Sequence, residues 1–303
     1  MCIRDSFKPN DLLVFNETKV FKARLSLIKS SGGKAEILII KKLSKYEALC
    51  LTKGINKNNT KQKVLTQNFP VNIEILKNEE KLLRIKFDQD IDKLCTAQGS
   101  MPIPPYLNRQ STALDDDRYQ SIFANDAYNN SVAAPTASLH FDKSLWKKVV
   151  KSVETANINL DIGYGTFQPL NDDPINQTTK LHKESYHVPQ ETVKKIRNCK
   201  KNNGRVIALG TTTLRTLESA ISKDGNIESG SNDTDIFIFD GYAFKVVDCL
   251  ITNFHLPMSS LLMLVSAFGG KENILSAYKH GVSCGYKFFS YGDAMLIEEC
   301  LSK

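Results

Sequence analysis

The spacing of hydrophobic residues changes in three steps along the chain. Near the start, Leu12–Phe15 is an uninterrupted apolar run followed by the polar turn Asn16–Thr18, which is typical of a buried strand. Between about residues 24 and 97, short runs alternate apolar and polar positions. From Gly99 onward, strand-like and helix-like spacing alternate, which predicts a mostly parallel sheet with helices, the pattern of an α/β fold.

The middle stretch predicts a small all-β domain. Its runs are separated by turns that contain glycine or asparagine, with little helical spacing between them. Regular short strands of this kind are typical of a barrel or a sandwich. The strand-like runs are 24–28, 35–40, 46–51, 71–75 and 82–87. We therefore expect a discontinuous α/β catalytic domain, residues 1–22 and 98–303, interrupted by a β-barrel insertion at residues 23–97.

One strand–helix unit in the last stretch has the features of a binding site. The pattern predicts a buried strand at Arg205–Leu209, a turn at Gly210–Thr213 and a helix at Leu214–Ile221. Free N–H groups at the helix start, with the threonine hydroxyls, can hold an anion or a ribose, and Arg215 can reach a carboxylate or phosphate. The alternative is that the threonines only cap the helix, since the turn matches neither a P-loop nor a dinucleotide-binding fingerprint.

A second candidate site lies near the end of the chain. The apolar stretch Phe244–Ile251 leads to Asn253 and His255, and another apolar stretch, Leu261–Phe268, follows at once. Open α/β sheets present their chemistry in this way, at the carboxyl ends of strands. The run Phe288–Met295 repeats the arrangement, with an apolar approach and then a polar end. The alternative for either run is an ordinary strand end with capping residues.

Histidines provide further candidates for acid–base chemistry. His140 lies in Ser131–Phe141, a proline-broken run of small residues that fits a backbone approaching a ligand closely. Single histidines are more often structural, but histidines at the ends of separate α/β elements favour proton transfer. Neither an H-E-x-x-H motif nor a histidine–cysteine cluster is present, so no metal is expected.

Composition narrows the class of protein. The 303 residues carry a formal net charge of +7, which gives weak support to a nucleic-acid partner. The seven cysteines are scattered and form no C-x-x-C pair, as expected for reduced thiols. No apolar run is long enough to span a bilayer, and no signal peptide is recognisable at the start. We expect a cytoplasmic protein with no membrane contact.

Ordered stretches over most of the chain resemble one known family. They include Gly99–Tyr106, Gly204–Glu218 and the run Thr252-Asn253-Phe254-His255-Leu256-Pro257. With these residues the sequence is similar to the S-adenosylmethionine:tRNA ribosyltransferase-isomerases of queuosine biosynthesis. The matching stretches are 11–20, 23–25, 99–106, 117–120, 131–141, 162–169, 182–188, 204–218, 234–238, 244–268 and 286–297.

The resemblance implies a specific reaction. The ribosyl moiety of S-adenosylmethionine is transferred to 7-aminomethyl-7-deazaguanine at the tRNA wobble position and isomerised, which gives epoxyqueuosine and releases adenine and methionine. S-adenosylmethionine is consumed as a substrate, so no separate cofactor is expected. The expected partner is the anticodon stem-loop of tRNA, and the expected oligomeric state is a monomer.

Such a reaction needs a general base, an acid for the departing adenine and groups that hold the methionine ends. We predict that S-adenosylmethionine is bound by Gly210, Thr211, Thr212 and Arg215. The predicted catalytic residues are His140, His255 and Glu184, with the two histidines as the proton-transfer candidates. Asn253 and Asp293 are predicted to orient the substrate.

Some positions depart from the family pattern. Met1–Ser6 match nothing in it and resemble a translated sequencing adapter, and a further amino-terminal segment of the pattern is missing, so we expect a truncated gene model. Asn130 and Ser138 replace usual glycines, Asp161 a usual histidine and Asp240 a usual proline. The alternatives are a methyltransferase, against which the missing glycine-rich loop argues, and a non-catalytic tRNA-binding module if the truncation abolishes activity.

Overall fold

The computed structural model describes residues 3–66, 69–79, 82–164 and 181–299. The chain forms two compact units. The first contains residues up to 18, residues 121–128 and residues from 135 onward, and the second contains residues 19–120 and 129–134. The boundaries expected from the sequence, 1–22 and 98–303 around 23–97, stay a prediction. Residues 165–169, part of the stretches that carry the family resemblance, lie outside the described residues.

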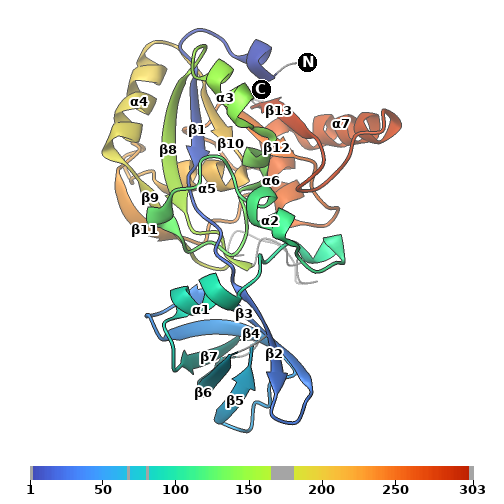
Figure 1. The fold of residues 1–303 in the computed structure, drawn as a ribbon. Coiled ribbons are helices and arrows are strands. Elements are labelled where there is room, and N and C mark those ends of the chain that lie inside the picture. Colours follow the sequence, from blue (N-terminus) through green and yellow to red (C-terminus); the bar gives the residue numbers. More distant parts are fainter. Residues whose placement is uncertain (1–2, 67–68, 80–81, 165–180, 300–303) are drawn as a thin grey trace. The chain divides into compact units, whose positions relative to one another are not determined.

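The described part of the first unit is built on a mixed sheet (Figure 1). Its order is β11-β9-β8-β1-β10-β12-β13, in which β8, β1, β10 and β12 run parallel and the three outer strands are antiparallel to their neighbours. The strands are β1 Leu12–Asn16, β8 Glu154–Leu160, β9 Glu184–Val188, β10 Val206–Leu209, β11 Gly230–Thr234, β12 Cys249–Asn253 and β13 Ala294–Glu298. The α/β prediction is confirmed.

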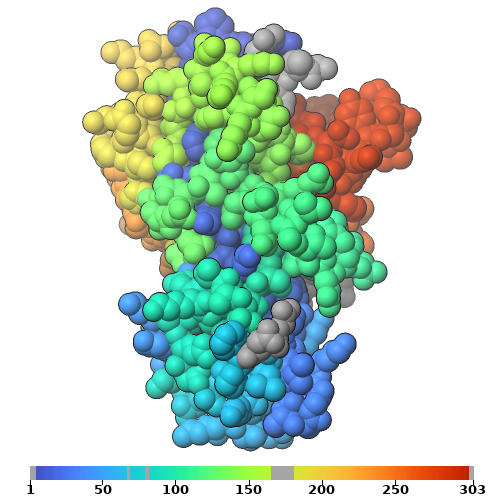
Figure 2. All heavy atoms as spheres, viewed as in Figure 1, coloured from blue at the N-terminus to red at the C-terminus, as the bar shows by residue number. Residues whose placement is uncertain are grey.

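Both faces of the parallel strands are covered, as their continuous apolar sequences require. On one face Leu13, Ile207 and Ile251 pack with Phe141 and Val149. In the space-filling view, dark-blue atoms of the early chain form a group at the top and, below it, show in patches between green atoms of later segments (Figure 2). The helices of this unit are η1 Ile3–Ser6, η3 Asp126–Tyr128, η4 Thr136–His140, α3 Lys143–Val149, α4 Gln190–Lys201, α5 Thr211–Ser219, α6 Ser260–Gly269 and α7 Lys271–Ser283.

Helix α5 covers the other face of the sheet. Tyr186 of β9 donates a hydrogen bond from its hydroxyl to the carbonyl of Ser219 at 3.1 Å, which ties the end of the helix to the sheet. The helix starts at Thr211, earlier than the predicted Leu214, because Gly210 turns the chain sharply at φ 90°. Across the described residues, no helix combines the length and the apolar character needed to cross a membrane.

The second unit contains a closed barrel of order β2-β3-β4-β7-β6-β5, which confirms the predicted barrel. Apolar side chains alternate into it; Leu25 and Leu27, for example, are buried while Ser26 and Ile28 are exposed. The strands are β2 Arg24–Lys29, β3 Lys34–Lys42, β4 Glu47–Lys53, β5 Lys61–Leu65, β6 Pro70–Glu79 and β7 Leu82–Phe87. The unit also holds α1 Ile91–Gln98, η2 Pro105–Leu107 and α2 Ala113–Arg118.

Strand β5 is the barrel strand that the sequence pattern missed. Its sequence Lys-Gln-Lys-Val-Leu reads as a solvated segment, and only Val64 is buried. The strand forms because its backbone pairs with β6 on one side and β2 on the other. Backbone pairing that closes a barrel leaves no signal in hydrophobic spacing.

Two apolar segments near the end of the chain were expected to be strand, and the structure shows that this was wrong. Residues 244–248 are not a strand; the backbone N–H groups of Lys245, Val246 and Val247 instead donate to the Glu218 carboxylate at 3.0, 3.0 and 3.1 Å. The run from Phe288 to Asp293 also precedes its strand, β13, rather than ending one. In both places apolar residues pack outside regular structure, which sequence spacing cannot distinguish from a strand.

Candidate active site

Most of the predicted site residues gather at one edge of the sheet. The parallel strands end together at this edge, which places Gly210 after β10 and Asn253 at the end of β12. Strands β9 and β13 are antiparallel to their neighbours, so they begin where those neighbours end. Glu184 and Asp293, at the starts of β9 and β13, therefore lie at the same edge. Topology, rather than sequence order, brings them there.

Glu184 and Arg215 form a buried ion pair. The Nη1 atom of Arg215 donates to Oε2 of Glu184 at 2.6 Å, and both side chains are 6% exposed. The other carboxylate oxygen of Glu184 accepts the backbone N–H of Gly163 at 2.9 Å. Both oxygens of Glu184 thus have a donor. This carboxylate holds the guanidinium at the start of α5.

Arg215 has hydrogen-bonding capacity left over. Its Nε and Nη2 atoms are buried and have no hydrogen-bond partner among the described residues. These two atoms form one edge of the guanidinium, whose parallel N–H groups match the two oxygens of a carboxylate or phosphate. A buried donor without a partner is unfavourable, so this edge is suited to a ligand anion.

The start of α5 and the short helix η4 contain further unpaired groups. The hydroxyls of Thr212 and Ser138 are buried without a hydrogen-bond partner among the described residues. Gly210 lies beside both segments: a Cβ added there would be 3.5 Å from Cβ of Ala137 and 3.7 Å from Oγ1 of Thr212. Thr211 begins α5, whose first N–H groups have no intrahelical acceptor and, in the described part of the chain, no side-chain cap.

His140 and Asn253 are in direct contact. Nδ2 of Asn253 lies 2.7 Å from Nε2 of His140 and donates to the carbonyl of Phe289 at 3.2 Å. The amide oxygen of Asn253 accepts from the hydroxyl of Thr136 at 3.1 Å. Burial lowers the pKa of His140, and the negative charge of Asp293 offsets part of that effect. His140 is therefore held as a neutral imidazole near pH 7.

His255 is separated from this pair. Its Nε2 lies 2.9 Å from the hydroxyl of Thr252, and its backbone N–H donates to the Tyr278 hydroxyl at 2.8 Å. Thr252 and Asn253 are adjacent in β12, so their side chains point to opposite faces of the sheet. His255 and His140 therefore bond to side chains on opposite faces of the sheet. Burial lowers the pKa of His255 to about 4, so it too is neutral near pH 7.

Asp293 has a structural contact as well as a charge near the site. Its carboxylate accepts the backbone N–H of Lys287 at 2.7 Å, and its own N–H donates to the Lys287 carbonyl at 2.7 Å. These bonds close the turn that leads into β13. No group of three or more histidine, cysteine, aspartate or glutamate side chains in the described ranges is placed to hold a metal ion.

Several contributors were not singled out from the sequence. The carbonyl of Phe289 and the N–H of Gly163 are backbone groups, which no residue pattern reveals. Asp161, one of the departures, lines a hollow of about 420 Å³ on the outer strands, where it accepts from Nδ2 of Asn159 at 3.0 Å. The remaining lining residues are Tyr128, Ser185, Tyr186, His187, Ser231, Asn232 and Asp233.

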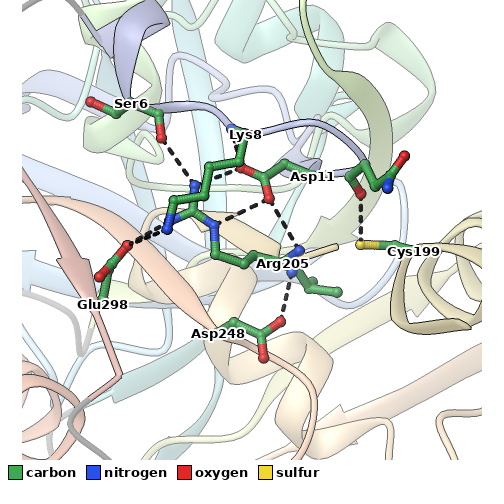
Figure 3. A network of polar contacts seen from close by, with 9 residues as sticks. Ser6, Lys8, Asp11, Cys199, Arg205, Asp248 and Glu298 are labelled. Carbon is green, nitrogen blue, oxygen red and sulfur yellow. Dashed lines mark hydrogen bonds and ion pairs between the residues drawn. The ribbon is translucent and has the colours of Figure 1, made fainter. Parts of the chain in front are cut away.

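The opposite edge of the same sheet is organised around Arg205 (Figure 3). Its Nε and Nη2 donate to the two carboxylate oxygens of Asp11 at 3.1 and 2.6 Å. Nη2 also donates to the Ser6 carbonyl at 3.0 Å, and Nη1 donates to Glu298 at 2.5 Å. Every nitrogen of this guanidinium has an acceptor within the protein. This edge leaves Arg205 no capacity for a ligand.

Comparison with known proteins gives one family. Residues 2–297 match the family model described as queuosine biosynthesis protein. An S-adenosylmethionine:tRNA ribosyltransferase-isomerase from Nitrosomonas eutropha is 46% identical over 294 residues, covering 96% of this chain and 84% of the relative. A relative of the same name from Acinetobacter baylyi is 44% identical over 301 residues, covering 99% of this chain and 87% of the relative.

A solved structure is also similar. The crystal structure of an S-adenosylmethionine tRNA ribosyltransferase from Thermotoga maritima matches with a TM-score of 0.51 and 34% sequence identity. The match covers 97% of this chain and 85% of the other. The similarity therefore includes both the sheet and the barrel.

Proposed function

Since the chain belongs to the queuosine biosynthesis family of S-adenosylmethionine:tRNA ribosyltransferase-isomerases, we propose the reaction that its S-adenosylmethionine and tRNA substrates undergo. The enzyme moves the ribosyl moiety of S-adenosylmethionine to 7-aminomethyl-7-deazaguanine at the wobble position. It isomerises that moiety to the epoxycyclopentanediol of epoxyqueuosine and releases adenine and methionine. S-adenosylmethionine is the substrate, and no separate cofactor takes part.

The open edge of Arg215 is the observation that carries this proposal. The methionine part of S-adenosylmethionine ends in a carboxylate, which fits the paired N–H groups of Nε and Nη2. Glu184 holds the other side of the guanidinium and keeps that edge turned away from itself. The hydroxyl of Thr212 and the free N–H groups from Thr211 onward add donors at the same helix start.

The reacting part of the substrate is assigned to the neighbouring His140 and Asn253. A proton must leave the carbon next to the sulfonium, and the departing adenine needs a proton donor or hydrogen-bond donor. The small residues before His140 allow close approach, since Ala137 packs beside Gly210 and neither it nor the buried Ser138 has a large side chain. Asp293 contributes negative charge near His140. His255 stays a predicted second proton-transfer residue, on the far face of β12.

The barrel is assigned to tRNA because it carries the positive charge. Residues 23–97 contain 15 lysines and arginines and 8 aspartates and glutamates, which accounts for the whole net charge of +7. A hollow of about 450 Å³ on the barrel is lined by Lys61, Lys63 and Lys86, together with Asn72 and Asp88 among others. Lysines on one surface are the electrostatic footprint of a phosphate backbone. We keep the anticodon stem-loop, a monomer and a cytoplasmic location as parts of the proposal.

Product analysis tests the reaction. The protein is incubated with S-adenosylmethionine and tRNA that carries 7-aminomethyl-7-deazaguanine, and small molecules and nucleosides are identified by mass spectrometry. Free adenine, free methionine and epoxyqueuosine are expected in equal amounts. S-adenosylhomocysteine would indicate a methyltransferase, and retained tRNA binding without products would indicate a non-catalytic tRNA-binding module.

Salt dependence tests the tRNA surface. Replacing Lys61, Lys63 and Lys86 together by serine should reduce the slope of log affinity against log salt by about 0.7–0.9 for each phosphate that these lysines neutralise in the wild-type complex. Lys194, an exposed residue of α4, provides the matched control, and its replacement by serine should leave the slope unchanged. An unchanged slope in the triple variant would remove this face of the barrel from the proposal.

A further inference from the structure

The hydrogen bonds of Asn253 determine which nitrogen of His140 carries the proton. Asn253 is 2% exposed and ends β12 on the face that carries Cys249 and Ile251, toward η4. Its amide contacts three groups: the Thr136 hydroxyl, the Phe289 carbonyl and Nε2 of His140. Together these contacts use the amide oxygen and both hydrogens of the amide nitrogen.

The Phe289 carbonyl fixes the orientation of the amide. A carbonyl oxygen can only accept, so the amide atom 3.2 Å from it must be the nitrogen. The same nitrogen lies 2.7 Å from Nε2 of His140. An amide nitrogen can only donate, so Nε2 must accept and cannot carry a hydrogen. The proton of the neutral imidazole is then on Nδ1.

The Phe289 carbonyl is itself held by a strained backbone. Phe289 has φ 72°, a left-handed conformation that is rare for a bulky residue and that persists only where surrounding contacts enforce it. Its N–H donates to the Phe254 carbonyl at 3.0 Å, and its carbonyl also accepts the N–H of Gly292 at 3.1 Å. A relaxed backbone at Phe289 would turn this carbonyl away from Asn253.

We propose that Asn253 is a positioning residue that holds His140 as the neutral tautomer with its proton on Nδ1, so that His140 serves the reaction as a hydrogen-bond donor and not as a base through Nε2. No hydrogen bond to Nδ1 of His140 is present among the described residues, which leaves this donor for a substrate acceptor such as a nitrogen of the departing adenine. The role in the reaction rests on the proposed function. The general base is then a different group from His140 Nε2.

The neutral charge state of His140 supports the same assignment. A cationic imidazole would direct an Nε2–H at the amide N–H groups of Asn253 and break that hydrogen bond. Asp293 is the charged group that acts on His140 within the described residues, and it favours the cation. Burial outweighs it and lowers the pKa of His140. The neutral form and the Asn253 contact therefore stabilise each other.

Nitrogen NMR of the imidazoles tests the tautomer without any substrate. In the full chain labelled with ¹⁵N-histidine, His140 should show a protonated Nδ1 and an unprotonated Nε2 at pH 7. Asn253→Asp places acceptors opposite Nε2, so the proton should move to Nε2 and the titration midpoint of His140 should rise. Thr252→Val, which alters only the group facing His255, is the matched control and should leave the His140 signals unchanged.

Turnover then tests the role. At a pH above the raised titration midpoint, where His140 of Asn253→Asp is neutral with its proton on Nε2, the donor at Nδ1 is removed. There the variant should lower kcat for adenine release by about 100-fold with a much smaller change in the KM for S-adenosylmethionine. A wild-type His140 with its proton on Nε2, a cationic His140 at pH 7, or an unchanged tautomer in Asn253→Asp would overturn the inference. Wild-type protein that releases no adenine would instead overturn the proposed function, whatever the tautomer.

Discussion

Two arginines at opposite ends of β10 show how one sheet separates stability from binding. Arg205 directly precedes the strand, and Arg215 follows it in α5. Each places a guanidinium against a buried carboxylate, Asp11 in one case and Glu184 in the other. Asp11 takes the Nε and Nη2 edge of Arg205, whereas Glu184 takes only Nη1 of Arg215. We call Asp11–Arg205 the closed pair, because every guanidinium nitrogen has an acceptor. We call Glu184–Arg215 the open pair, because Nε and Nη2 of Arg215 have no partner among the described residues.

The difference follows from the direction in which each carboxylate approaches. Asp11 lies just before β1 and meets Arg205 side-on, in register with the neighbouring strand start. Glu184 begins the antiparallel strand β9, and its second oxygen is occupied by the N–H of Gly163. Asp11 also accepts backbone N–H groups, from Lys8 and Arg205, and still spans the Nε and Nη2 edge, so the direction of approach is what separates the two pairs. The same two residue types therefore give a structural clamp at one edge and a candidate binding group at the other.

Breaking the closed pair should produce the largest effect. Arg205→Met leaves the Asp11 carboxylate, 1% exposed, without its main partner, and should lower the free energy of unfolding by about 3–5 kcal/mol. Denaturant titration measures this decrease. Arg84→Met is the matched control. Arg84 also donates from Nε and Nη2, both to Oε2 of Glu47 on a more exposed surface, so this substitution should lower the free energy of unfolding by about 1 kcal/mol or less. Equal decreases would contradict the contrast between closed and exposed pairs.

Altering the open pair should act on the substrate. Arg215→Lys keeps a positive charge near Glu184 but removes the Nε and Nη2 edge, so the Kd for S-adenosylmethionine should rise about 100-fold, or about 2.7 kcal/mol. Isothermal titration measures the affinity, and denaturant titration checks that most of the stability is retained. If the affinity stays within twofold of wild type, Arg215 does not bind the carboxylate. The open pair would then have no role in substrate binding.

A glycine at the binding edge gives a test with a smaller expected effect. Gly210→Ala should cost about 1–2 kcal/mol, since φ 90° disfavours a side chain while the space around the added Cβ is ordinary. Gly225→Ala, also at positive φ (81°) but in open space, is the control and should show a similar decrease in stability. A much larger decrease at Gly210 would mean that the turn is packed too tightly to admit substrate. Thermal and denaturant unfolding give both values.

The pH dependence of stability should show the smallest effect. Burial acts to raise the pKa of Asp11, but hydrogen bonds from Arg205 and from the N–H of Lys8 outweigh it and hold the pKa below its ordinary value. A folded-state pKa below the unfolded value means that this stabilisation is complete above about pH 4 and disappears as pH falls through the folded pKa. The stability difference between wild type and Asp11→Asn should therefore shrink below pH 4. A difference that is constant from pH 7 to pH 3 would argue against an ionised Asp11 in the closed pair.

Parts of the fold could be predicted from the sequence because they depend on local spacing. The buried run Leu12–Phe15 predicted β1, and the alternating runs predicted five of the barrel strands within a few residues. Strand β5 was missed because its lysines carry no apolar alternation, and the approaches before β12 and β13 were misread because apolar loop residues resemble strands. The spacing of apolar residues indicates which side chains are buried. Loop residues can be buried as well as strand residues, so the spacing does not distinguish them.

The candidate site was predicted in its members but not in its contacts. The helix start after Gly210, the histidines and Asn253 were all singled out as residue types suited to the chemistry. The contacts among these residues could not be read from the sequence: Asn253 bonds His140, whereas His255 bonds Thr252, which points to the opposite face of β12. The alternation of side chains along β12 determines which histidine each residue can contact. This arrangement depends on the position and register of the strand in the sheet.

The sequence by itself determined the family, the α/β class and the barrel, because long ordered runs of residues and their hydrophobic spacing survive without any knowledge of distant contacts. Only the tertiary structure decided which arginine is closed and which keeps an open edge, and which nitrogen of His140 faces an amide. Those outcomes depend on partners far apart in the chain, such as Asp11 with Arg205 or His140 with Asn253. Strand order and direction bring such partners together, and hydrogen-bond geometry then fixes which atoms remain available.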